Sequence, residues 1–343
     1  MRFRSNKIVT AASAWGLVIA VVACSSGDEP AGTAESNVSQ NNAAGGADSA
    51  TNVPGSDSAA PSSAVDEDAD VSSADSDIAP GGDDSGPTTP ADSATNSVAG
   101  CGKFSEPAGT VTVKLTVGGK TRSFEAYSPP PSQMVSLVFV LHGDGGTGAG
   151  IHSSFPLEKA SGNDAVVFYP DGNSKTWDLD HPENELPFFD AMIDYAKAHY
   201  CVDGSRVFAT GFSRGGYMSN QLGCFRGNVL KGIAPQSGGG PYQIGGKFDS
   251  KGQLICPGGS TSSLSIHGLS DSTVAPSEET FSENYWIYQN KCTKTFSASS
   301  PSPCQMAQGC TAGRSVGHCL ISGMGHSIWS NATQAVWGFF KTL

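Results

Sequence analysis

A short glycine-flanked turn holds the residue of this sequence best placed to act as a nucleophile. The segment Gly211-Phe212-Ser213-Arg214-Gly215 fits the pattern G-x-S-x-G. The run 206–210 predicts a buried strand before it, and 214–223 predicts a helix after it. In such a tight turn the serine hydroxyl lies at the helix N-terminus, where the helix dipole and free N–H groups favour negative charge. The pattern predicts a reactive Ser213; the alternative is an ordinary surface serine in a glycine-rich turn.

A serine hydroxyl is a weak nucleophile and needs a base within hydrogen-bond reach. Of the seven histidines, His326 follows the last predicted strand in a glycine-flanked loop near the C-terminus. It alone has the chain position that the order Ser–Asp–His requires, so we expect it to be the base. We expect His142 and His267 to brace turns at strand ends. The others lie in a helix, beside a strand or in polar loops, at His152, His181, His199 and His318.

The third partner should be a carboxylate that follows a strand between Ser213 and His326. The segment 265–274 supplies Asp271. Its carboxylate would hold the imidazole in the required tautomer and stabilise the charged form of the ring. The alternative role for Asp271 is to cap the turn before the next helix, which aspartate often does.

A tetrahedral intermediate on Ser213 would need two N–H donors directed at its oxyanion. One should be the backbone N–H of Arg214, the residue after the serine. The other should come from the turn 142–145, and we expect the backbone N–H of Asp144 to supply it. Only the backbone of Asp144 is implied, because its carboxylate would repel an oxyanion if it pointed inward.

These candidates require a frame of alternating strands and helices. Strands are predicted at 110–117, 121–127, 135–141, 165–169, 206–210, 230–235, 263–266 and 319–322, and helices at 187–199, 214–223, 277–290 and 333–341. The first two strands read as an antiparallel edge hairpin. The alternation that follows predicts an α/β fold with a doubly wound, mostly parallel sheet. The candidate residues all follow strands, at the edge where such sheets place their sites.

The composition divides the chain into three parts. Residues 1–24 have a basic start and an apolar run, which is typical of a secretory signal peptide. Its end, 21–24, resembles a lipoprotein cleavage site with Cys24 as the lipidated residue; the alternative is ordinary cleavage after Ala23. Residues 25–100 contain fourteen acidic residues, no Lys or Arg and almost no large apolar residues, so we expect a disordered acidic linker. We assign 101–343 to a single catalytic domain, which has no basic patch suited to nucleic acid.

Eight cysteines follow residue 100, at Cys101, Cys201, Cys224, Cys256, Cys292, Cys304, Cys310 and Cys319. An even number in a secreted chain predicts disulfides, although eight cysteines allow 105 pairings. We expect all eight to be oxidised, with Cys304 paired to Cys310 and Cys292 paired to Cys319. A zinc site is disfavoured because no CxxC pair is present.

Several motifs together carry a family resemblance. They are Leu141-His142-Gly143, Tyr169-Pro170-Asp171-Gly172 with Trp177, Phe188-Phe189-Asp190, Tyr200-Cys201-Val202-Asp203, the serine motif 211–216, His267-Gly268 with Asp271, and Gly325-His326. Residues 101–343 resemble the secreted α/β-hydrolase family that joins feruloyl and acetyl-xylan esterases with polyhydroxybutyrate depolymerases. The cysteine-rich run 303–310, followed by Cys319, is also similar. The resemblance implies a serine esterase with no metal or organic cofactor. The chain departs from the pattern of this family at Glu185-Leu186 and at Asp144. These departures concern the identity of the substrate and leave the expected roles of Ser213, Asp271 and His326 unchanged.

Two classes of function remain open. The first is a monomeric, extracellular or surface-anchored hydrolase that acts on feruloyl or acetyl esters of plant cell-wall xylan, or alternatively on a polyester such as polyhydroxybutyrate. The second is a catalytically inactive surface binding protein on a hydrolase scaffold. Trp177 and Trp329 are candidate walls of an aromatic acyl pocket, which favours phenolic esters; the alternative is that both pack in the core. The expected partner is the ester-bearing polysaccharide or polyester, with membrane contact only through a lipid at Cys24.

Overall fold

The structure, a computed structural model, describes Cys101 and residues 106–343. The predicted signal peptide at 1–24, the lipidation site at Cys24 and the predicted linker at 25–100 lie outside these residues. Within the part of the chain that is described, no helix is long and apolar enough to cross a membrane.

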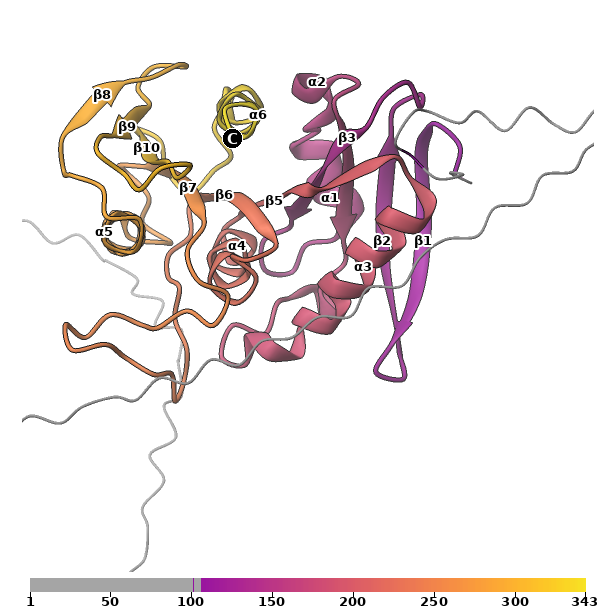
Figure 1. Cartoon of the computed structure of the whole chain (residues 1–343), viewed down its shortest axis with the longest axis horizontal. Helices are drawn as coiled ribbons and strands as arrows, with labels where there is room; N and C mark the ends of the chain where they lie inside the picture. Colours follow the sequence, from indigo (N-terminus) through magenta and orange to yellow (C-terminus); the bar gives the residue numbers. More distant parts are fainter. Residues whose placement is uncertain (1–100, 102–105) are drawn as a thin grey trace, which may run out of the picture. The chain divides into compact units, whose positions relative to one another are not determined.

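A ten-stranded sheet organises the described residues, in the order β1-β2-β4-β3-β5-β6-β7-β10-β9-β8 (Figure 1). Strands β4, β3, β5, β6, β7 and β10 run parallel, and the pairs at both edges are antiparallel. The strands are β1 (Gly109–Val117), β2 (Lys120–Ser128), β3 (Val135–Leu141), β4 (Ala165–Pro170), β5 (Val202–Phe212), β6 (Leu230–Gln236), β7 (Ser262–Gly268), β8 (Phe296–Ala298), β9 (Gln305–Ala307) and β10 (Val316–Ile321). The mostly parallel α/β sheet expected from the alternating pattern is confirmed.

Helices cover both faces of this sheet. They are α1 (Gly148–Ser154), α2 (Glu158–Ser161), α3 (Leu186–His199), α4 (Arg214–Phe225), α5 (Pro276–Gln289) and α6 (Ala332–Lys341), with short 3₁₀ turns at Asn173–Lys175 and Pro182–Asn184. The buried strand β3 shows why two layers are needed, because its side chains alternate between two cores. Leu137 and Phe139 pack in the core that contains residues of α3, α4 and α5. Val138 and Val140 pack in the core that contains residues of α1 and α6.

The predicted elements form, with local differences. The edge hairpin is confirmed as β1 paired with β2. The strand before Ser213 is longer than expected and spans Val202–Phe212. Two helices and two strands were not predicted, namely α1, α2, β8 and β9. The strands β8 and β9 have three residues each and none of these is buried, so no apolar alternation marks them in the sequence.

Disulfides join all eight cysteines after residue 100, as expected, but two expected pairings are wrong. The bonds are Cys101–Cys201, Cys224–Cys256, Cys292–Cys310 and Cys304–Cys319. The unpredicted strand β9 explains the error. His318 of β10 lies opposite Gln305 of β9. The next antiparallel register position brings Cys304 to Cys319, which leaves Cys310 for Cys292.

Candidate active site

Ser213 lies in a strained turn between β5 and α4. Its φ of 55° is in the left-handed region that side chains other than glycine rarely adopt. Only glycine fits at the two flanking positions, because a side chain there would clash with neighbouring backbone atoms. A Cβ on Gly215 would lie 2.3 Å from the carbonyl oxygen of Leu141, and one on Gly211 would lie 2.5 Å from that of Gly215. The serine N–H donates to the carbonyl of Gln236 at 2.9 Å, which ties the turn to the end of β6.

The three side chains that the sequence singled out form one hydrogen-bonded chain. His326 Nε2 lies 2.9 Å from Ser213 Oγ, and His326 Nδ1 lies 2.7 Å from Asp271 Oδ2. They come from segments that follow β5, β7 and β10, far apart in sequence and adjacent at one edge of the sheet. The Ser270 N–H donates to Met324 O at 3.0 Å, which holds the Asp271 and His326 loops together.

The two oxygens of Asp271 have different partners. Oδ1 accepts the backbone N–H groups of Thr273 and Val274, each at 2.9 Å. Oδ2 faces His326. Burial opposes ionisation of this carboxyl, but the hydrogen bonds from His326 and the two N–H groups outweigh it and lower its pKa. The turn-capping role and the contact with His326, which the sequence presented as alternatives, therefore coexist on one side chain.

The loop after β3 lies beside the serine. A Cβ on Gly143 would approach Ser213 Cβ to 3.3 Å. The N–H of the next residue, Asp144, has no acceptor within the described part of the chain. Arg214 is the first residue of α4, so its N–H has no acceptor inside the helix. The Asp144 carboxylate accepts the Thr176 hydroxyl at 2.5 Å and lies 3.8 Å from Arg214 Nε, which partly offsets its charge.

His142 braces this loop, as expected. Its Nε2 accepts the Gly172 N–H at 2.9 Å, so Nδ1 carries the proton and donates to Gly143 O at 2.7 Å. Burial is the main cause of its lowered pKa, which favours this neutral form.

The two candidate tryptophans have different positions. Trp177 is fully buried, and its indole N–H donates to His142 O at 2.9 Å. It supports the loop from within the core, so its expected place in a pocket wall is wrong. Trp329 is also buried, at 9% exposed, and packs in the core that contains residues of α6, but it lines a surface hollow of about 540 Å³ together with His326 and Phe212. Phe212 was not predicted, although it is one of the variable positions of the serine motif.

Other histidines also lie close to carboxylates, and His267 Nε2 is 3.5 Å from Asp271 Oδ2. His267 donates from Nε2 to Val274 O at 3.0 Å and is buried beneath the Asp271 turn. His318 of β10 contacts Glu283 of α5, and their ligand atoms lie within 4.8 Å of those of Glu279. Burial opposes the charge of His318, but the contact with Glu283 outweighs it and raises the histidine pKa. Within the described residues, this cluster is the one group of three or more His, Cys, Asp or Glu residues whose ligand atoms all lie within 4.8 Å of one another, and it contains none of the three residues at the serine turn.

Comparisons with known proteins identify relatives of part of this chain. No protein-family model matches the chain. It is 30% identical over 223 residues to a probable feruloyl esterase C of Aspergillus clavatus, a match that covers 60% of this chain and 76% of the relative. It is 31% identical over 173 residues to feruloyl esterase C of Emericella nidulans, covering 48% of this chain and 59% of that relative.

The fold also has a counterpart among solved structures. An acetyl xylan esterase from Aspergillus awamori superposes with a TM-score of 0.54 at 18% identity, over 67% of this chain and 99% of that one. This likeness identifies the α/β-hydrolase fold. The 30% identity to a probable feruloyl esterase C, over three quarters of that relative, shows that the chain belongs to the feruloyl esterase family and is a carboxylic ester hydrolase.

Proposed function

We propose that this esterase hydrolyses feruloyl or acetyl esters of plant cell-wall xylan, with Ser213 as nucleophile, His326 as general base and Asp271 as the carboxylate that orients the imidazole. The observation that carries the proposal is the hydrogen-bonded chain from Ser213 Oγ through His326 to Asp271. The relatives are feruloyl esterases by name, which supports the ester class.

The reaction has two halves. Ser213 Oγ attacks the ester carbonyl while His326 Nε2 accepts its proton, and the carbonyl oxygen becomes an oxyanion. The N–H groups of Arg214 and Asp144 donate to that oxygen; each such donor contributes about 10²–10³ in rate. His326 then gives its proton to the departing alcohol, which leaves the acyl group on Ser213. Water, deprotonated by His326, attacks the acyl carbon, and His326 then gives that proton to Ser213 Oγ as the Oγ–acyl bond breaks and the acid leaves.

A substrate panel tests this proposal. Wild-type protein should hydrolyse methyl ferulate and 4-nitrophenyl acetate, and Ser213→Ala should abolish both activities. His181→Ala is a matched control, since this exposed histidine pairs with Glu183 in a surface loop. Preferential cleavage of a hydroxybutyrate oligomer would favour the polyester alternative. If the wild-type protein cleaves none of these esters, the proposal is wrong, and the alternative of a catalytically inactive binding protein on a hydrolase scaffold is favoured.

We also propose that the enzyme works outside the cell, tethered through Cys24 by the acidic segment 25–100. The basic and apolar composition of 1–24 and the cysteine at its end support this location. The four disulfides of the described domain suit an oxidising compartment. Replacing Cys24 by Ser should remove the protein from the membrane fraction of expressing cells; unchanged fractionation would exclude the lipid anchor.

A further inference from the structure

The long segment between β6 and β7, residues 237–261, exposes an unusual amount of apolar surface. Ile244 is 66% exposed, Phe248 is 58% exposed and Tyr242 is 40% exposed, and Phe281 of α5 is 41% exposed beside them. These four side chains line one hollow of about 290 Å³. Exposed apolar side chains gathered in this way mark a contact site for another molecule.

The aromatic rings at this hollow are ordered. Tyr242 stacks on Phe281, with centroids 4.9 Å apart and planes 18° from parallel. Tyr217 lies next in the row, 6.5 Å from Tyr242. Glu278 Oε2 accepts both tyrosine hydroxyls, at 3.1 Å from Tyr217 and 2.9 Å from Tyr242. The hydroxyls are therefore occupied, and the exposed part of Tyr242 offers its ring.

This aromatic row is connected to the serine turn through the backbone of α4. Tyr217 is in the first turn of α4, and its N–H donates to Ser213 O at 3.1 Å. Leu179 and Asp180, which follow Trp177 closely in the chain, also line the hollow. The Trp177 carbonyl in turn accepts from Arg214 Nε at 2.8 Å. Segments that line or adjoin the hollow are thus hydrogen-bonded to the serine turn through Tyr217 and Arg214.

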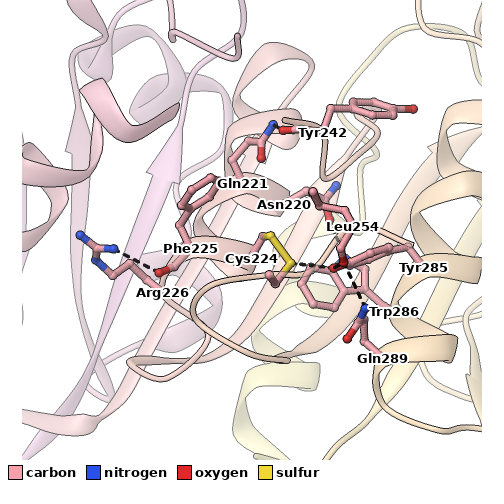
Figure 2. The surroundings of a disulfide bond; sticks show 11 residues. Asn220, Gln221, Cys224, Phe225, Arg226, Tyr242, Leu254, Tyr285, Trp286 and Gln289 are labelled. Carbon is pink, nitrogen blue, oxygen red and sulfur yellow. Dashed lines mark hydrogen bonds between the residues drawn. A yellow bond between two sulfur atoms is a disulfide. The ribbon is translucent and has the colours of Figure 1, made fainter. Parts of the chain in front are cut away.

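The segment that carries Tyr242 is fixed rather than loose. Figure 2 shows its anchoring on α4 and α5, where the Gln221 side chain donates to the Tyr242 carbonyl and the Tyr285 hydroxyl contacts Leu254. The disulfide Cys224–Cys256 joins the segment to α4. Asn220 Nδ2 adds a hydrogen bond to Gly239 O at 2.9 Å. The apolar side chains therefore stay exposed on a rigid support, which lowers the entropy cost of binding.

The polar groups of the hollow indicate its occupant. Asp180, Gln243 and Gln253 line it, and no lysine or arginine does. An anionic lipid surface would need basic residues there. A sugar ring has an apolar C–H face that packs on a flat aromatic ring, and edge hydroxyls that bond to amide and carboxylate groups. We propose that Tyr242 and Phe281 form a stacking subsite for a sugar of the polysaccharide chain that carries the scissile ester. This proposal rests on the proposed function.

The test compares a polymeric with a small substrate. For the full-length enzyme, kcat/KM is measured on soluble feruloylated arabinoxylan and on methyl ferulate, and the ratio of the two is formed. Tyr242→Ala and Phe281→Ala should each lower this ratio about tenfold, because each substitution removes one of the two aromatic rings that form the proposed sugar subsite. Tyr242→Phe keeps the ring and should keep the wild-type ratio. Met134→Ala is the matched control, since this 44% exposed side chain precedes β3, whereas Ser213 follows a strand.

A second measurement does not depend on catalysis. Retardation of the wild-type protein in a native gel that contains unesterified arabinoxylan should be lost in the Tyr242→Ala, Phe281→Ala double variant. An unchanged activity ratio with unchanged retardation would overturn the subsite while leaving the esterase intact. An equal loss on both substrates would also overturn it, because Tyr242 would then act through Glu278 and Tyr217 on the reaction itself. Failure of wild type on methyl ferulate would instead count against feruloyl esters in the proposed function.

Discussion

The ring of Phe212 lies against the imidazole of His326, with centroids 4.8 Å apart and planes 38° from parallel. Phe212 is the residue immediately before Ser213, so a single turn carries both the hydroxyl and a surface that limits the movement of the imidazole. His326 is otherwise held at Nδ1 by Asp271. The contact therefore adds a second restraint on the ring that must face Ser213 Oγ.

Replacing Phe212 by Ala should lower kcat by about tenfold or more, because a misplaced imidazole loses the geometry of proton transfer. KM for a small ester should change little. Phe212→Leu fills part of the space and should recover part of the rate. Steady-state kinetics on 4-nitrophenyl acetate provide the measurement. A raised KM with normal kcat would instead indicate that Phe212 contacts substrate.

Asp271→Asn separates the two roles of this side chain. The amide oxygen can still cap the turn at Thr273 and Val274, but it no longer supplies a charged acceptor for His326 Nδ1. We expect kcat to fall by about 10⁴ while the fold persists, because the wrong imidazole tautomer is favoured. Asp203→Asn is the control, since Asp203 accepts from Ser205 within the first residues of β5. Activity of Asp271→Asn within tenfold of wild type would reduce Asp271 to a capping residue.

The sequence predicted best those features that a local pattern of residues determines directly. Apolar runs predicted the buried strands, and the glycines at 211 and 215 predicted the tight turn because no side chain fits there. The positions of Asp271 and His326 followed from chain order. Tertiary packing decides whether a buried aromatic side chain also reaches a surface hollow. Nothing local therefore distinguished Trp177, which is fully buried, from Trp329, which is 9% exposed and lines the hollow.

The cysteine pairing also depends on tertiary structure that no local sequence pattern indicates. It depends on β9, whose residues Gln305–Ala307 are too few and too exposed to show a strand pattern. Non-reducing peptide mapping should recover peptides that link Cys292 to Cys310 and Cys304 to Cys319, and no free thiol among the eight cysteines. Loss of the Cys304–Cys319 bond through a double serine variant should destabilise the domain by about 3 kcal/mol in the chain-entropy account. Recovery of a Cys304–Cys310 peptide would contradict the register of β9 on β10.

The buried cluster on α5 predicts a pH dependence of stability that is separate from the reaction. Glu279 is buried and accepts the Ser265 hydroxyl of β7 at 2.9 Å, with Glu283 and His318 nearby. Burial, followed by repulsion from Glu283, raises the pKa of Glu279 from 4.5 to about 7. Between these values the folded state holds a proton that the unfolded chain has lost. The free energy of unfolding should therefore fall as pH rises from 4.5 to 7 and level off above that range.

Glu279→Gln removes this titration and keeps the size of the side chain and an acceptor for Ser265. Relative to wild type, the variant should gain stability between pH 5 and pH 8, by an amount on the order of 3 kcal/mol. Thermal or urea unfolding at several pH values measures the difference between the two proteins. Glu183→Gln, on an exposed side chain of the 3₁₀ turn, should follow the wild-type curve. The raised pKa of His318 makes stability fall with rising pH in both proteins, so it leaves the comparison largely unaffected. A stability difference that stays constant from pH 5 to pH 8 would mean that Glu279 is ionised in the folded protein throughout, with its charge balanced inside the cluster.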